Sequence, residues 1–267
     1  MMLPPALPAT IVAAPCSLSG DIRALAVSGR TVMVRLPVGY DLLINAKRRY
    51  PVLYLLDGQN VFDDATAFAG EWHADETATR LEAAGKIVPV IIVAVYNAGA
   101  ERVNEYTPVK DAKLNAGGGA VAYGKWMADT LKLAIDRAYR TKTDTANTAI
   151  GGSSLGGLFA LHQSLTAPNV WGKAAVLSPS VWWAERAILQ TVATAPKQPV
   201  RLWVDIGTAE DKSGNALAGA QALRDALTAR GYKPGSDFSY TEAVGAAHNE
   251  AAWSARFGDA LTYLFPR

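Results

Sequence analysis

The sequence predicts an α/β protein with about eight mostly parallel strands, an antiparallel N-terminal hairpin and helices on both faces of the sheet. From Ile22 onward, short apolar runs alternate with longer stretches of helical period, which is the pattern of consecutive β-α-β units. Half of the 267 residues are apolar and 19% are charged, a composition that excludes a disordered chain. No repeat or linker interrupts the series. We therefore predict a single domain over 21–267, preceded by a disordered or extended lead-in over 1–20.

The individual elements follow from run length and turn residues. Ile22–Val27 and Thr31–Leu36 are joined by only three residues, too few for a helical crossover, so we expect them to pair as an antiparallel hairpin. Pro51–Leu56 and Val90–Tyr96 are unbroken apolar runs, typical of strands covered on both faces. The remaining strands are expected at 148–151, 173–177, 201–206 and 238–244, and the helices at 71–84, 124–139, 157–165, 181–192, 216–230 and 251–264.

Charge and cysteine content exclude several kinds of partner. Lys and Arg (26) nearly balance Asp and Glu (24), without a long run of one sign, so nucleic-acid binding is not expected. The lone Cys16 can form no intrachain disulfide, and no Cys/His ladder would hold a metal. We expect neither a metal nor a cofactor. A homodimer is compatible with the sequence.

The N-terminal residues and the apolar runs indicate in which cellular compartment the protein is expected. No apolar stretch reaches the roughly 18 residues that span a bilayer, so we expect no membrane span. Residues 1–19 are apolar but lack the positive start of an export signal, and prolines interrupt them. A cytoplasmic protein is therefore expected, with export as the alternative.

The most informative motif is Gly152-Ser153-Ser154-Leu155-Gly156, which matches G-x-S-x-G. It lies where the strand at 148–151 becomes a helix, and in such a nucleophile elbow a sharp turn lifts the serine above the carboxyl edge of the sheet. We predict Ser154 as a nucleophile. The alternative is an ordinary Gly/Ser turn that caps the helix.

A serine nucleophile needs a base and an acid, in the chain order Ser, Asp/Glu, His. His248 follows the last predicted strand and fits as the base, whereas His162 lies more than two turns along the helix after Ser154 and is expected to be packed. His73 is expected at the surface. The loop after 201–206 offers Glu210, which we favour as the acid, and Asp211 as the alternative.

Two amides and three aromatic residues complete the predicted site. Oxyanion donors are expected from the backbone N–H of Leu155 and from that of Gln59, which follows the strand at 51–56. Trp182 and Trp183 are candidates for the wall of an acyl or aromatic pocket, and Trp72 for the side facing them. The alternative for each tryptophan is packing in the core.

Nearly the whole chain from about Ile22 to Phe265 resembles the putative-esterase branch of the α/β-hydrolases, which contains esterase D, enterochelin esterases and feruloyl or acetyl-xylan esterase domains. The matching stretches are VRLPVGY (34–40), YPVLYLLDGQN (50–60), NEYTP (104–108), GGSSLGG (151–157), SPSVWW (178–183), DIGTAED (205–211) and HNEAAW (248–253). The resemblance implies the α/β-hydrolase fold and a Ser-acid-His hydrolase of carboxylic esters without a cofactor. It places Ser154, Leu155 and His248 on functional positions, but many relatives carry Asp where Glu210 aligns.

The expected function is that of a serine carboxylesterase that hydrolyses small acyl or aryl esters through an acyl-enzyme. A feruloyl or acetyl-carbohydrate esterase, a siderophore esterase and a thioesterase are alternatives that use the same groups. A non-catalytic relative that only binds ligands would be expected to have lost Ser154 or His248, and both are present.

Overall fold

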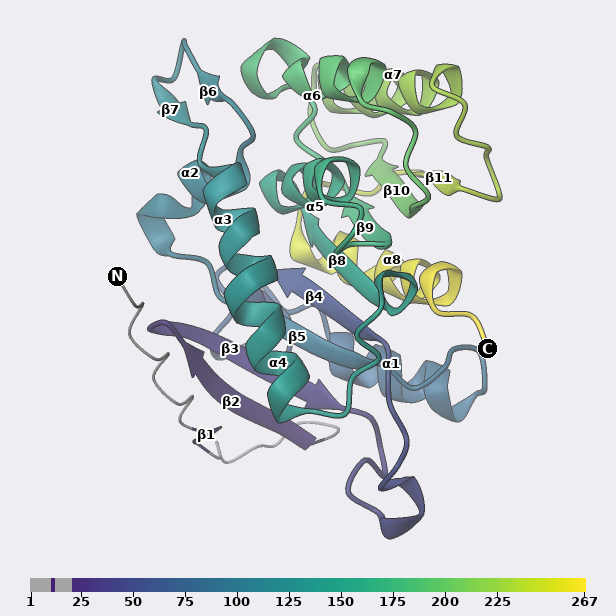
Figure 1. Ribbon diagram of the computed structural model, residues 1–267. Coiled ribbons are helices and arrows are strands. Elements are labelled where there is room, and N and C mark those ends of the chain that lie inside the picture. Colours follow the sequence, from purple (N-terminus) through teal and green to yellow (C-terminus); the bar gives the residue numbers. More distant parts are fainter. Residues whose placement is uncertain (1–10, 13–20) are drawn as a thin grey trace.

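The computed structural model describes residues 11–12 and 21–267, and a sheet of nine strands runs through its centre (Figure 1). The predicted lead-in 1–20 lies outside the described residues, except that Ile11–Val12 form a short edge strand, β1. The other strands, in spatial order from β1, are β2 (Asp21–Val27), β3 (Arg30–Leu36), β5 (Ile91–Val95), β4 (Val52–Leu56), β8 (Thr148–Ser153), β9 (Lys173–Leu177), β10 (Arg201–Gly207) and β11 (Phe238–Ala243).

The N-terminal hairpin forms as predicted. β2 and β3 pair antiparallel from Asp21 opposite Leu36 to Val27 opposite Arg30, and β3 then pairs antiparallel with β5. The loop consists of two residues, Ser28 and Gly29, with φ values of 51° and 79°. Two positive φ angles are the conformation that matches the twist of hairpin strands. From β5 to β11 all neighbouring strands are parallel.

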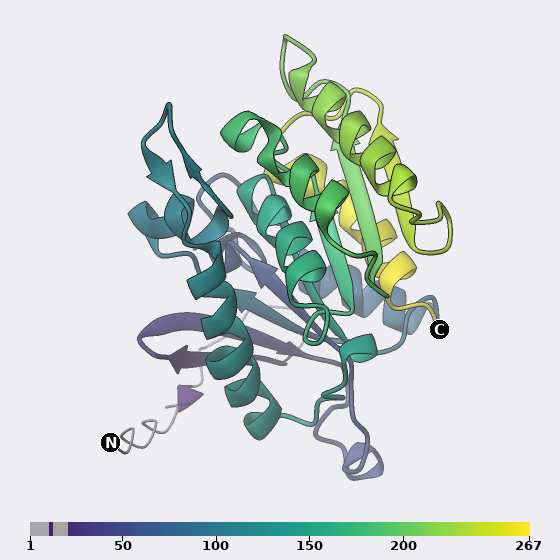
Figure 2. The ribbon, with the colours of Figure 1, turned by 45° about the horizontal axis from the view of Figure 1, so that its top comes forward.

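Helices cover both faces of the sheet, as predicted (Figure 2). All five residues of β4 and of β5 are buried, which explains their unbroken apolar sequences. One face packs against α1 (Ala74–Ala83) and α8 (Glu250–Leu264). The other carries α3 (Ala120–Trp126), which continues through a π-helical segment (Met127–Lys132) into α4 (Leu133–Ala138), and also α5 (Leu155–Thr166), α6 (Trp183–Thr194) and α7 (Asn215–Ala229).

Two segments differ from the expected elements. The long loop before Ala120 contains the short helix α2 (Arg102–Tyr106) and a hairpin of β6 (Lys110–Asp111) and β7 (Ala116–Gly117). A Cβ atom on Gly117 would lie 2.2 Å from Thr107 Oγ1 and 2.6 Å from Trp183 Cζ2. The glycines of this segment therefore allow close packing of β7. The second difference is at the start of α6, where 184–186 have left-handed φ values of 45–67°.

The described helices have no stretch both long and apolar enough to cross a bilayer.

Candidate active site

Ser154 occupies a strained turn between β8 and α5. Its φ and ψ are 56° and −122°, a conformation that few residues with a side chain adopt. The Ser154 amide donates to the carbonyl of Leu177 at 3.1 Å. A Cβ on Gly157 would lie 2.7 Å from that same carbonyl oxygen. The glycine that follows the motif is therefore required by the close approach of β9.

The structure brings Ser154, His248 and Glu210 into one hydrogen-bonded line. Ser154 Oγ lies 3.0 Å from His248 Nε2, and His248 Nδ1 lies 2.7 Å from Glu210 Oε2. The three residues come from the ends of β8, β11 and β10, which meet at one edge of the sheet. The ring of Trp253 meets the imidazole edge-on, with 4.9 Å between ring centroids. Such a line can pass a proton from a hydroxyl to an imidazole held by a carboxylate.

The two candidate acids occupy different environments. The Glu210 side chain is 1% exposed, and its Oε1 accepts hydrogen bonds from the Gly207 amide at 2.8 Å and from the Ser178 hydroxyl. Asp211 instead accepts from the amides of Asn215 and Ala216 at the start of α7. These bonds lower the pKa of Asp211, and the bond from the Ala216 amide contributes most. Asp211 thus caps a helix, and Glu210 is the carboxylate beside the imidazole.

A buried polar cluster that sequence reasoning missed lies behind Glu210. Ser178 Oγ accepts from Trp253 Nε1 and from Arg256 Nη2, both at 2.9 Å. Arg256 Nη2 also donates to Asp205 Oδ1 at 3.0 Å, inside β10. Burial raises the pKa of Asp205, and the Arg256 guanidinium opposes that rise. Ser178 and Trp253 lie in the quoted stretches SPSVWW and HNEAAW, whereas nothing in the sequence marks Arg256.

Leu155 and Gln59, the predicted oxyanion donors, lie on two different elements. Leu155 is the first residue of α5, directly after Ser154. Gln59 lies in a short 3-10 helix, Gly58–Asn60, that follows β4 and lines the same cavity as Ser154. A Cβ on Gly58 would come within 2.5 Å of the backbone of Ala94 in β5. The absence of a side chain at 58 therefore lets this helix sit directly against the sheet.

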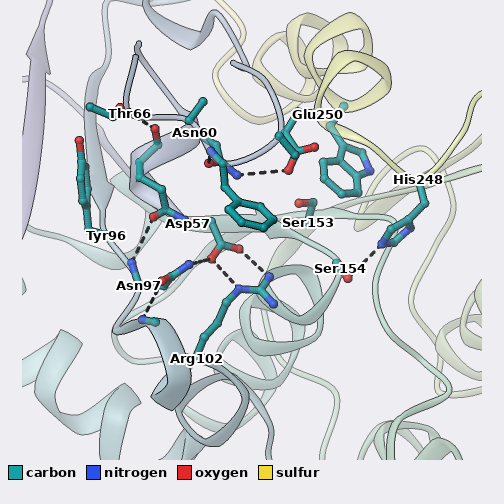
Figure 3. Close-up of a pocket in the computed structure, with 16 residues that line it drawn as sticks. Asp57, Asn60, Thr66, Tyr96, Asn97, Arg102, Ser153, Ser154, His248 and Glu250 are labelled. Atoms are coloured by element: carbon teal, nitrogen blue, oxygen red, sulfur yellow. Dashed lines mark hydrogen bonds and ion pairs between the residues drawn. The ribbon is translucent and has the colours of Figure 1, made fainter. Parts of the chain in front are cut away.

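A cavity of about 880 Å³ opens beside Ser154 (Figure 3). Asp57 and Arg102 form a two-pronged ion pair in it, with Nε–Oδ1 and Nη2–Oδ2 distances of 2.7 Å. Besides these two, the lining consists of Gln59, Asn60, Thr66, Ala67, Phe68, Ala69, Tyr96, Asn97, Gly99, Ser153, Ser154, His248, Glu250 and Trp253.

The three tryptophans predicted for the pocket are not among the residues that line this cavity, and that expectation is corrected. Trp72 is 4% exposed because it packs against Trp253 and Phe257. Trp183 is 3% exposed, and its indole donates to the carbonyl of Val109. Trp182 is half-exposed outside the cavity.

The aromatic residues that do line the cavity are Phe68, Tyr96 and Trp253. Phe68 stands out because its side chain is 91% exposed. Its position in a loop of irregular sequence gave no signal for a pocket role, whereas Trp253 belongs to the quoted stretch around His248.

The other two histidines lie away from Ser154. His162 is buried on α5, and burial lowers its pKa to about 4. His73 precedes α1 with its side chain 53% exposed. In the described part of the chain, His73 is also in the one group with spacing suited to a metal ion, together with Glu71 and Glu76. Glu71 and Glu76 lie 3.4 Å and 3.9 Å from its Nδ1.

Comparison with known proteins gives one family match and several relatives. The model of the family described as "Putative esterase" matches residues 27–264. An endo-1,4-beta-xylanase/feruloyl esterase of Xylanibacter ruminicola is 29% identical over 84% of this chain and 28% of its own length. The ferri-bacillibactin esterase BesA of Bacillus subtilis is 29% identical over 60% of each chain. This chain therefore spans less than two thirds of the length of each of these two relatives.

Solved structures give the same fold. The BES protein from Bacillus cereus superimposes with a TM-score of 0.70 at 21% identity, covering 100% of this chain and 97% of the other. A ferulic acid esterase gives a TM-score of 0.70 at 18% identity, covering 97% and 99%. The predicted α/β-hydrolase fold is confirmed.

Proposed function

Because this chain belongs to the esterase family whose model covers residues 27–264, we propose that it is a serine carboxylesterase for small acyl or aryl esters. The observation that carries the proposal is the line of Ser154, His248 and Glu210 at the edge of the cavity, with 3.0 Å and 2.7 Å between successive polar atoms. Both distances lie within the reach needed for proton transfer to a general base.

In the proposed first step, Ser154 Oγ attacks the ester carbonyl while His248 Nε2 takes its proton. Glu210 holds the Nδ1–H of the same ring and stabilises the imidazolium that forms. The amides of Leu155 and Gln59 then bind the oxyanion of the tetrahedral intermediate. Such donors stabilise the transition state because negative charge develops on that oxygen during the attack.

Collapse of the intermediate breaks the bond to the alcohol, which leaves with the proton held by His248. The acyl group remains on Ser154 Oγ as an ester. A water molecule then attacks this acyl-enzyme while His248 removes one of its protons, and His248 returns that proton to Ser154 Oγ as the carboxylic acid leaves. Apart from this water molecule, the steps use side chains and backbone amides of the chain.

Esters of aromatic acids, including feruloyl esters, are a second candidate class. The aromatic side chains of Phe68, Tyr96 and Trp253 in the cavity lining favour them, because rings stack on rings in such sites. The relative from Xylanibacter ruminicola, whose name includes feruloyl esterase, supports the same class. Acetyl-carbohydrate, siderophore and thioester substrates would use the same three residues.

Hydrolysis of p-nitrophenyl acetate, p-nitrophenyl butyrate and methyl ferulate by the wild type tests this function. We expect kcat/KM to fall by about 10³-fold or more in Ser154→Ala and in His248→Ala, since either change removes the activated nucleophile. Circular dichroism of each variant serves as the folding control. Wild-type protein inactive on all three esters, or full activity in Ser154→Ala, would exclude the proposal.

A further inference from the structure

The charges in the cavity are not evenly balanced. Asp57 Oδ1 accepts from Arg102 Nε and from Asn97 Nδ2, each at 2.7 Å, while Oδ2 accepts from Arg102 Nη2. The pair therefore contributes no net charge. Among the described residues that line the cavity, Arg102 is also the one lysine or arginine. Its charge is already matched by Asp57.

Glu250 is the acid left without such a match. It is the first residue of α8, its side chain lines the cavity, and Asn60 Nδ2 donates to its Oε1 at 3.2 Å. An amide is neutral, so this bond does not pair the carboxylate with a cation. Burial raises the pKa of Glu250 and the charge of Asp57 adds to that rise, whereas its own backbone amide, His248 and Arg102 act in the opposite direction. The helix N-terminus also opposes the rise because it favours an anion.

Glu250 and Ser154 border the same space. Figure 3 places Glu250, Asp57 and Ser154 around one opening, and Glu250 is two residues from His248. A substrate whose carbonyl carbon lies at Ser154 Oγ and whose remainder occupies this cavity therefore shares the space with the Glu250 carboxylate. Like charges repel more strongly in a partly buried cavity than in water, because the effective dielectric constant is lower there.

Resting on the proposed esterase function, we propose that the cavity selects esters without a negative charge and that Glu250 is the residue that rejects anionic ones. A neutral aryl or carbohydrate ester meets no repulsion from Glu250 and can accept or donate hydrogen bonds at Asn60 and Asn97. An ester with a free carboxylate must either approach Glu250 or compete with Asp57 for Arg102. Both routes carry an electrostatic cost.

The test compares 4-acetoxybenzoate with methyl 4-acetoxybenzoate at about pH 8, where the free carboxylate of the first ester is ionised. Both esters deliver the same acetyl group to Ser154, so deacylation is common to both. Each kcat/KM is divided by the hydroxide-catalysed rate constant of the same ester, which corrects for the different leaving groups. We expect the normalised value to be about tenfold or more higher for the methyl ester.

Two variants distinguish the effect of the Glu250 charge in the cavity from the effect of removing a negative charge elsewhere on the protein. Glu250→Gln keeps an oxygen that can accept from Asn60, and it should bring the ratio of the two esters close to one. Glu185→Gln removes the same charge from an exposed side chain outside the cavity, and it should leave the ratio unchanged.

The outcomes distinguish the two proposals. Equal normalised rates in the wild type, or a ratio unchanged in Glu250→Gln, would overturn the role of Glu250 while leaving the esterase function standing. A preference for the anionic ester would mean that Arg102 recognises carboxylates, which is the opposite of the inference. No hydrolysis of either ester would instead count against the proposed function itself.

Discussion

The hydrogen bonds that Ser178 accepts determine which neighbour its hydroxyl proton faces. The indole of Trp253 and the guanidinium of Arg256 can only donate, so their bonds occupy both lone pairs of the Ser178 oxygen. The single hydroxyl proton then points to Glu210 Oε1. The Gly207 amide donates to the same oxygen. Glu210 Oε2 then lies free to face His248 Nδ1 at 2.7 Å. With the ring proton on Nδ1, Nε2 offers a lone pair to the Ser154 hydroxyl at 3.0 Å.

Substitution of the two neighbouring acids tests this arrangement. Glu210→Ala should lower kcat/KM for p-nitrophenyl butyrate by about 10²–10⁴-fold, because the imidazole loses the group that fixes its tautomer. Asp211→Ala should keep kcat/KM within about twofold, because its carboxylate bonds to the start of α7 instead. The control is the melting temperature, which should fall slightly in Asp211→Ala. Equal losses of activity in both variants would contradict the assignment.

The position of the turn after β4 depends on a glycine, because any side chain there would collide with β5. Gly58 begins the short helix that carries Gln59, and a Cβ there would meet the backbone of Ala94 and Val95 at 2.5 Å. Tyr106 Oη accepts from the Asp57 amide at 3.2 Å and holds the start of the turn. The position of the Gln59 amide is therefore set by packing between β4, β5 and α2.

We predict that Gly58→Ala shifts this turn and lowers stability by about 1–3 kcal/mol, the usual cost of overpacking. Its kcat should fall more than the loss of folded protein explains, because the Gln59 amide moves. Gly258→Ala is the matched control, since in α8 a Cβ would meet its nearest neighbour at 3.5 Å. It should raise stability by about 0.5–1 kcal/mol. Unchanged kcat in Gly58→Ala would argue against an oxyanion role for Gln59.

The longer elements could be predicted from sequence because each has a regular pattern. The hairpin and the strands of the parallel sheet begin and end within two residues of their expected limits. The hairpin of β6 and β7 was missed, because two-residue strands show no periodicity. The first turn of α6 was predicted as ordinary helix, and nothing in its sequence indicates the left-handed backbone at 184–186.

At the scale of the whole molecule, the order of parallel strands explains why distant residues meet. β8, β9, β10 and β11 are successive neighbours, so the loops after β8, β10 and β11 open at one edge. The positions of Ser154, Glu210 and His248 after strands of one parallel sheet were therefore enough to predict that the three side chains meet. The cavity wall could not be predicted in the same way. Arg102 begins the short helix α2 after β5, and Phe68 lies in an irregular loop after β4. The paths of both segments are set by tertiary packing.

Covalent labelling tests the proposed role of Ser154 as the nucleophile most directly. A fluorophosphonate reacts with a serine only when a base activates the hydroxyl. Mass spectrometry of the labelled wild-type protein should find one adduct per chain, on the peptide that contains Ser154. Ser154→Ala should remain unlabelled, and His248→Ala should react far more slowly. An adduct on a different residue, or equal labelling of the wild type and Ser154→Ala, would contradict the role of Ser154 as the nucleophile.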